Sequence, residues 1–252
     1  MFFADLTWPQ LKRVPRDAPI VIPVAAIEQH GHHLPVATDT LLLTEFVRRV
    51  EESIGDQILT APVQWFGNSD HHLDFGGTLS APPRVFLDML NGVINNFLSE
   101  GFKRIVILNG HGGNDVPAKQ ALFEIRQEHR GRNDLLLAMT TYWSLGTEPW
   151  QDCPVIHQRE MGHACEWETS MIMVIRPDLV GEYQSASPVE PGNPFRPGHR
   201  AWVTQDRSVP GHIGWPHLAS VEKGEVLLNS FTRDVVLWLT RIAEWDGASW
   251  NG

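Results

Sequence analysis

The stretch APIVIPVAAI, residues 18 to 27, decides the fold class of this 252-residue chain. It is an unbroken apolar run rich in Val and Ile, without the alternation of polar and apolar residues that a half-exposed strand shows. Such a run is typical of a strand that is buried on both faces, as in the parallel sheet of an α/β protein. We therefore expect helices on both sides of this strand.

The segments that follow alternate between strand and helix patterns. Further strands are predicted at 57–63, 103–110 and 134–143. Helices are predicted at 39–54, 82–102, 114–131, 162–175 and 221–245. This alternation implies right-handed crossovers between parallel strands. We predict a three-layer α/β/α fold with a mostly parallel sheet, as a single domain over residues 1–252. The stretch 181–216, rich in Pro, Gly and His, is too long for an ordinary connection and predicts a functional loop or lid.

Composition and charge exclude several classes of function. The net charge of −10 disfavours nucleic acid or an anionic membrane as the main partner. No apolar run approaches the roughly 20 residues that span a bilayer, and the first residues lack the pattern of a secretory signal. Two cysteines are too few for a disulfide framework or a Cys-type zinc site. These features predict a soluble, cytoplasmic protein.

Three polar clusters follow the predicted strands, where open α/β sheets bind their ligands. The first cluster lies in EQHGHHLPVATD, the second is NGHGGN at 109–114, and the third is HACEWE at 163–168. The metal-binding or titratable residues of these clusters are Glu28, His30, His32, His33, Asp39, His111, His163, Glu166 and Glu168.

The first cluster has the ligand types of a two-metal hydrolase. Glu28 and His30 are two residues apart, so in extended backbone they point to the same side. After a short turn, Asp39 can direct its carboxylate to the same point and bridge two ions. His111 stands on a glycine-flanked turn that allows close backbone approach. Glu166 and Glu168 are two apart on a helix, so only one of them is expected to face this pocket.

Each cluster alone also has a simpler interpretation. Asp39 is placed to cap the helix that follows it, and NGHGGN is a common kind of turn. Glu166 and Glu168 could interact favourably with the positive end of the helix dipole. A single histidine in a loop is most often solvated. A metal site is favoured because a parallel sheet would bring all three clusters together.

Several motifs taken together resemble those of the creatininase (creatinine amidohydrolase) family. They are EQHGHHLPVATD, HHLDFGGTLS, NGHGGN, HACEWETS, RPDLV and GHIGWPHLASVEKGE, and they run from about residue 20 to about residue 240. The resemblance implies a creatininase-like α/β/α domain with a binuclear centre of zinc, manganese or iron. It further implies a hydrolase of amide-like bonds, and a homo-oligomer such as a hexamer built from dimers.

The resemblance also implies roles for individual residues. By motif, Glu28, Asp39 and His111 correspond to ligands of one metal ion. His30 and Asp39 correspond to ligands of the other, with Asp39 as the bridge. His163 corresponds to the catalytic histidine of the family.

The chain departs from creatininase itself at the third motif. Creatininase has His-Tyr-Glu-Asn there, and its glutamate is a metal ligand. Here Gly112 and Gly113 stand in the middle of the motif, so the carboxylate and a substrate-contacting tyrosine are missing. Glu166 could supply the carboxylate from the facing helix, and Glu168 of the shared ETS element is the other candidate. We therefore identify a family member other than creatininase, with Gly112, Gly113 and Trp143 on the substrate side.

These observations lead to a specific hypothesis for the reaction. A metal-bound hydroxide attacks the carbonyl carbon of a cyclic amide, a formamide or a related small carbonyl compound, and His163 carries a proton to the leaving nitrogen. His33 and His72, and also His32, could orient the metal ligands.

Relatives with NGHGGN include formamidopyrimidine deformylases, peptidases and keto-inositol ring hydrolases, and a keto-inositol ring remains an alternative substrate. Basic residues near the motifs are few, which disfavours a phosphorylated nucleotide; they are Arg159, Arg196 and Arg200. A non-catalytic metal-binding domain is the alternative from another class, although it would not require His163.

Overall fold

The structure, a computed structural model, describes residues 1–195 and 197–250, so Arg196 lies outside the described residues. Its sheet has four parallel strands in the order β2-β1-β3-β4. They are β1 (Ile20–Val24), β2 (Leu59–Thr60), β3 (Arg104–Asn109) and β4 (Leu136–Thr141). Every residue of β1 and β3 is buried, which confirms that the apolar run at 18–27 holds a central strand.

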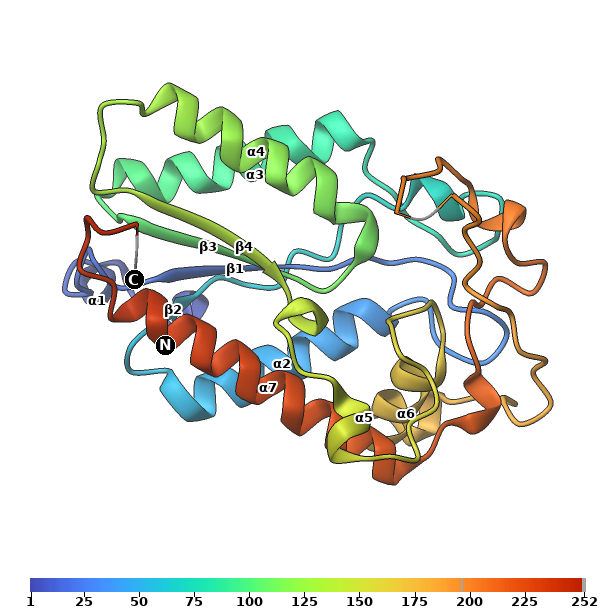
Figure 1. The fold of residues 1–252 in the computed structure, drawn as a ribbon. Helices are drawn as coiled ribbons and strands as arrows, with labels where there is room; N and C mark the ends of the chain where they lie inside the picture. Colours follow the sequence, from blue (N-terminus) through green and yellow to red (C-terminus); the bar gives the residue numbers. More distant parts are fainter. Residues whose placement is uncertain (196, 251–252) are drawn as a thin grey trace.

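Helices cover both faces of this sheet (Figure 1). One face carries α3 (Pro83–Ser99) and α4 (Asp115–Glu128). The other face carries α2 (Thr38–Ile54) and the long terminal helix α7 (Val221–Ala243), and α6 (Glu166–Ile175) packs against both of these. The predicted three-layer α/β/α fold is therefore confirmed. The single domain over residues 1–252 stays a prediction.

Alternate residues of the strands serve two separate cores. Ile20 and Ile22 belong to the apolar cluster under α3 and α4, whereas Val21 belongs to the cluster under α2 and α7. Successive side chains of a strand point to opposite faces, so a strand between two helical layers has no polar face. This is the physical reason for the unbroken apolar run.

Element boundaries differ from the predicted ones in two places that concern function. Helix α2 begins at Thr38, so Asp39 lies within the first turn and the N-cap position belongs to Ala37. The prediction that Asp39 caps this helix was wrong, because its carboxylate contacts two histidines instead of backbone N–H groups. Helix α6 begins only at Glu166, and His163 therefore lies in the loop before it.

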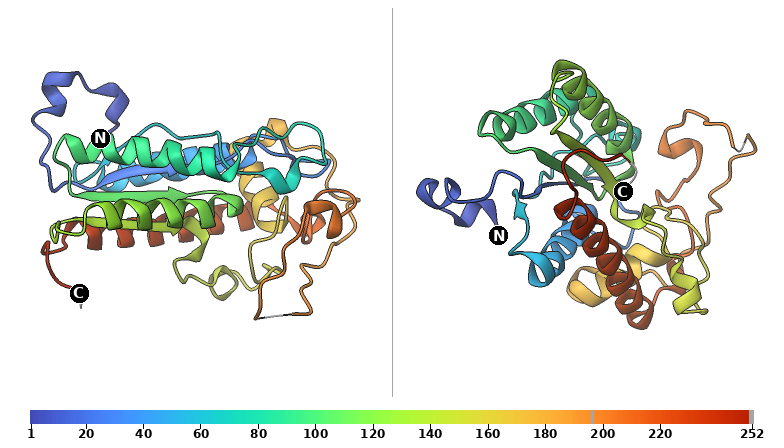
Figure 2. Two further views of the ribbon diagram at one scale, coloured as in Figure 1. Left: turned by 90° about the horizontal axis from the view of Figure 1, so that it is seen from above. Right: turned by 60° about the vertical axis from the view of Figure 1, so that its left-hand side comes forward.

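Short elements complete the chain. Two short helices, α1 (Trp8–Leu11) and α5 (Pro149–Asp152), were not predicted. Within 176–220 the described residues form no α-helix and no strand. This segment contains 3-10 turns at Pro177–Leu179, Thr204–Asp206 and Pro216–Leu218, and isolated β-bridges at Val189, Ile213 and Gly214. This segment lies beyond the end of the sheet at which the strands finish (Figures 1 and 2). None of the described helices has both the length and the apolar character that a membrane crossing requires.

Candidate metal centre

The first part of the site lies directly after β1. The His30 Nε2 atom is 3.2 Å from Asp39 Oδ1, and ligand atoms of Glu28, His30 and Asp39 lie within 4.8 Å of one another. All three residues are buried. The His30 Nδ1 atom donates to the backbone carbonyl of Glu28 at 3.0 Å, which turns Nε2 toward the carboxylates.

The second part comes from the turn after β3. The His111 Nδ1 atom lies 2.9 Å from Asp39 Oδ2 and 3.3 Å from Glu28 Oε1. Asn109 holds His111 in place: its Oδ1 accepts the His111 backbone N–H, and its Nδ2 donates to the His111 carbonyl. The His111 Nε2 atom donates to the Asn68 carbonyl at 2.9 Å. Glu28 and His30 after β1, Asp39 in the first turn of α2, and His111 after β3 therefore form one cluster.

The glycine turn explains why no carboxylate follows His111. A Cβ atom added to Gly113 would collide with the backbone oxygen of Asn68 and with the His111 ring, whereas one added to Gly112 would meet no atom within 4 Å. A glutamate at position 113 is therefore incompatible with this backbone. Position 112, in contrast, has room for a side chain.

The two glutamates of α6 point to different places. The Glu168 Oε1 atom is 3.7 Å from His30 Nε2, and Glu168 shares a possible metal-binding group with His30 and His163. Glu166 instead receives a hydrogen bond from Lys223 Nζ at 2.6 Å and further ones from the backbone N–H groups of His157 and Gln158. This placement corrects the expectation that Glu166 faces the centre, since two residues on a helix are about 200° apart around its axis.

His163 reaches the cluster from the loop before α6. Its backbone pairs with Ile213 in both directions, and its Nε2 donates to the Gln29 carbonyl at 2.6 Å. The Nδ1 atom lies 3.4 Å from Glu28 Oε1. The next residue, Ala164, has a φ of +47°, a conformation that costs free energy for a residue with a Cβ atom and that is often found at functional sites.

Two histidines on the turn at Asp70–His72 complete the surroundings. The His72 Nε2 atom lies 3.4 Å from Glu28 Oε1, and His72 shares a possible metal-binding group with Glu28 and His163. His71 was not predicted, although its ring stacks on His111 and it shares a possible metal-binding group with Glu28 and His111. The only signal for His71 was its position next to His72 in HHLDFGG.

The remaining predicted residues lie further away. The His33 Nε2 atom is 3.0 Å from the hydroxyl of Thr169, the neighbour of Glu168, and His32 is exposed. Trp143 packs edge-on against Tyr142, with the ring centroids 4.7 Å apart. Gln29, which was not predicted, places its Nε2 2.8 Å from His72 Nδ1 and donates to the Gly211 carbonyl.

The donor atoms of this cluster fit a metal ion. Among the described residues, Glu28 Oε2, His30 Nε2 and Asp39 Oδ2 are buried atoms that make no hydrogen bond of good geometry, although His30 Nε2 and His111 Nδ1 lie only 3.2 and 2.9 Å from the Asp39 carboxylate. Such atoms are rare in folded proteins, because each one costs free energy when it leaves water. His30, His111 and His163 share a further feature: one ring nitrogen of each donates to a backbone carbonyl while the other faces the cluster. This arrangement is characteristic of histidines that bind metals.

The pKa shifts within the cluster also fit a site for a cation. Burial raises the pKa of Glu28, which His111 only partly opposes. Burial would also raise the pKa of Asp39, but His30 and His111 outweigh it and keep this pKa well below its usual value. Although burial lowers the pKa of His111, Glu28 and Asp39 raise it to about 10, and the pKa of His30 is also raised, mainly by Asp39.

The pKa values of two other histidines of the cluster shift in the opposite direction. Burial, together with His71, lowers the pKa of His72 to about 2, and burial with His30 lowers the pKa of His163 well below its usual value. The raised pKa values of His30 and His111 favour the protonated form of both rings beside the carboxylates. A divalent cation would replace these protons when it binds.

Comparisons with known proteins extend over nearly the whole chain. The Creatininase family model, described as creatinine amidohydrolase, matches residues 4–239. The creatinine amidohydrolase of Pseudomonas putida is 30% identical over 249 residues, which cover 90% of this chain and 92% of that protein. The mycofactocin precursor peptide peptidase of Mycobacterium ulcerans (strain Agy99) is 29% identical, with 95% and 86% covered. A 3-dehydro-scyllo-inosose hydrolase of Thermotoga maritima is 33% identical over 114 residues, 44% of this chain and 36% of that protein.

Solved structures give the same result for the fold. A crystal structure of creatinine amidohydrolase (creatininase) superimposes with a TM-score of 0.81 at 27% identity, covering 95% of this chain and 96% of that one. A Zn-Zn form of a mutant creatininase has a TM-score of 0.81, and a manganese form of creatininase has 0.78; both are 28% identical and cover 95% of this chain and 97% of the other.

Proposed function

Because this chain belongs to the creatininase family of amidohydrolases, we propose that it uses two divalent metal ions to hydrolyse an amide-like bond in a small molecule. Cyclic amides and formamides are the substrate classes that we favour. The observation that carries the proposal is the buried cluster of Glu28 and Asp39 carboxylates, faced by His30, His111 and His163, each of which donates its other ring nitrogen to a backbone carbonyl. A non-catalytic metal-binding domain is disfavoured, since the relatives are named as hydrolases and peptidases.

The ligands would divide into two groups that share Asp39. Asp39 Oδ2 faces His111 and Asp39 Oδ1 faces His30, so one carboxylate reaches both sides of the cluster. We assign Glu28, Asp39 and His111 to one ion, and His30, Asp39 and Glu168 to the other. Divalent ions held there would polarise a substrate carbonyl and lower the pKa of a water molecule between them. Zinc, manganese and iron all suit this mixture of imidazole and carboxylate ligands.

His163 has the geometry of a proton carrier. Its Nε2–H is engaged by the Gln29 carbonyl, so in the neutral ring Nδ1 is the nitrogen without a proton, and this atom faces the cluster. Nδ1 can accept a proton from the attacking water and return it to the departing nitrogen. Gln29 also holds the loop at Gly211 beside this ring, which helps to exclude water.

A homo-oligomer, such as a hexamer, and a cytoplasmic location belong to the same proposal.

A substrate panel tests the proposed reaction. We expect metal-loaded protein to hydrolyse at least one cyclic amide or formamide at an ordinary enzymatic rate, on the order of 1–10³ per second. Creatinine should be a poor substrate, because Gly112 and Gly113 lack the side chains that creatininase places in this motif. Cyclic ketones of the inosose type belong in the panel, as one relative is named for that substrate. Failure of every compound at full metal occupancy would contradict the proposal.

Metal removal should destabilise the protein. We expect close to two divalent ions per chain by elemental analysis, and a lower melting temperature after treatment with a chelator. Ions that bind only the folded state stabilise it by roughly 3–4 kcal/mol at one hundred to one thousand times their dissociation constant. An unchanged melting temperature after complete removal of metal would count against a buried centre.

The two glutamates of α6 provide a matched pair of variants. Glu168→Gln should reduce the metal content toward one ion per chain. Glu166→Gln should keep both ions but lower the melting temperature, because Lys223 would lose the carboxylate that pairs with its buried ammonium group. Breaking one partner of a buried ion pair typically costs about 3–5 kcal/mol. Loss of metal in Glu166→Gln, with Glu168→Gln unaffected, would reverse the assignment.

A further inference from the structure

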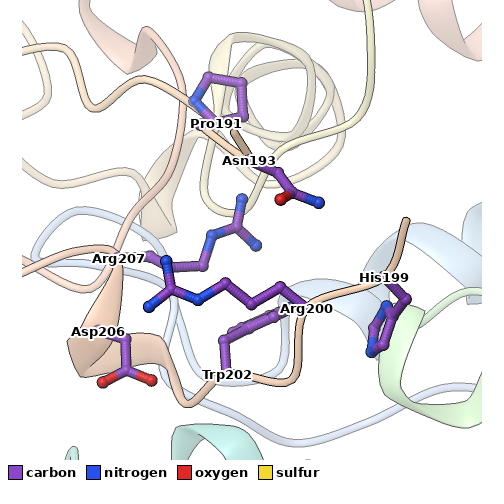
Figure 3. A pocket seen from close by; sticks show the side chains of 8 residues that line it. Pro191, Asn193, His199, Arg200, Trp202, Asp206 and Arg207 are labelled. Atoms are coloured by element: carbon purple, nitrogen blue, oxygen red, sulfur yellow. The ribbon is translucent and has the colours of Figure 1, made fainter. Parts of the chain in front are cut away.

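A small cavity of about 190 Å³ lies in the long segment beside the candidate centre. Figure 3 shows the side chains around it, and the residues that concern the argument are Asn193, His199, Arg200, Trp202, Asp206 and Arg207. The proposed reaction at the cluster uses none of them. Three of the six are basic, whereas one is acidic.

Direct contacts connect this cavity to the centre. The ring of Trp202 meets His71 edge-on with centroids 5.0 Å apart, and His71 in turn stacks on His111. Thr204 Oγ1, from the same segment, lies 3.1 Å from His72 Nδ1. One histidine ring therefore separates the wall of the cavity from a proposed metal ligand.

The charges in the cavity favour an anion. Arg200 and Arg207 both extend their guanidinium groups into it, and the Arg207 guanidinium lies 4.5 Å from the centroid of the Trp202 ring. The Asp206 carboxylate points away from both groups in Figure 3 and accepts the backbone N–H of Val203. A carboxylate or phosphate between two guanidinium groups can receive paired N–H donors from both.

We propose that this cavity is a subsite for an anionic group of the substrate, and that a carboxylate is the group it selects. The inference rests on the proposed function: the amide-like bond would lie at the cluster, and the carboxylate would lie between Arg200 and Arg207. Trp202 holds Arg207 by stacking and forms the wall between the two positions. The substrate class is thus an amide that bears a carboxylate several ångströms from the bond that is cleaved.

Binding of simple probes tests the subsite without a known substrate. Succinate, succinamide and inorganic phosphate are titrated calorimetrically into metal-loaded wild type, Arg200→Gln and Arg207→Gln. Arg130→Gln, an exposed site just beyond the end of α4, is the control with the same loss of charge. We expect succinate to bind about 10- to 100-fold more weakly to the first two variants, as for the loss of a hydrogen bond to a charged group. Arg130→Gln should bind like wild type, and succinamide should not bind.

The outcomes show whether the arginines or the metal ions bind the succinate. Metal content is measured for every variant, because carboxylates also bind metals. Equal succinate affinity in wild type, Arg200→Gln and Arg207→Gln would overturn the subsite and assign the binding to the ions. Loss of phosphate binding alone would overturn the choice of carboxylate.

Activity measurements distinguish a failure of the proposed subsite from a failure of the proposed function. N-formyl amino acids and their neutral carboxamides form matched substrate pairs. In Arg207→Gln, kcat/KM should fall for the acid and stay unchanged for the amide. If neither is hydrolysed by wild type, the proposed function is in doubt, and the succinate titration still decides the subsite.

Discussion

Asp39→Asn is expected to remove both metal ions and to abolish hydrolysis. The substitution keeps the size of the side chain but replaces one carboxylate oxygen by an NH₂ group, so the residue can no longer offer an anionic oxygen to each side of the cluster. In the structure these two oxygens face His30 and His111. The loss should exceed the roughly 10- to 100-fold effects that accompany changes around metal ligands. Elemental analysis and a rate measurement on the best panel substrate provide the test.

A matched control exists at the start of another helix. Asp115, like Asp39, lies in the first turn of its helix, but it is partly exposed and pairs with Lys119 on the surface. Asp115→Asn should therefore keep both ions and near-native turnover. If Asp39→Asn also keeps both ions, Asp39 is not the bridging residue and the assignment of ligands must be revised.

His163→Gln is expected to keep both ions and the affinity for substrate while turnover falls by about 10²–10⁴. Glutamine has a similar polarity and can still donate to the Gln29 carbonyl, but it cannot carry a proton between water and a leaving nitrogen. The measurements are kcat, KM and metal content. His32→Gln, at an exposed site next to the cluster, is the control that removes an imidazole without this effect.

Two other results would give His163 a different role. Because its Nδ1 lies 3.4 Å from Glu28 Oε1 and His163 belongs to two possible metal-binding groups, loss of an ion in the variant would make it a ligand. Near-native turnover would place the proton carrier elsewhere. His72, whose Nε2 is also 3.4 Å from Glu28 Oε1, is then the next residue to replace.

Local features of the sequence were sufficient for the fold and for most of the cluster. The apolar run at 18–27 predicts a strand buried on both faces because every side chain of such a strand meets a helical layer. Parallel strands end at one edge of the sheet, and Glu28, His30 and His111 follow strand ends directly, so their meeting could be predicted without coordinates. The prediction that Asp39 joins these residues required one further assumption, that the chain after His30 turns back toward the end of the strand.

Contacts between distant segments decided the rest. The sequence leaves both Glu166 and Glu168 as candidates. The hydrogen bonds that Glu166 receives from Lys223, 57 residues further on, and from the backbone of His157 and Gln158 show that Glu166 is the one engaged elsewhere. The backbone of His163 is held by Ile213, and its neighbour Ala164 adopts a positive φ that no sequence pattern indicates.

The cavity lined by Arg200 and Arg207 depends on such contacts entirely. Trp202 and Arg207 belong to a segment without regular secondary structure, whose path is set by packing against the turn at Asp70–His72. Periodicity predicts strands and helices because their geometry repeats along the chain. A loop has no repeat, so its position follows from the surfaces that it meets, and these exist only in the folded protein.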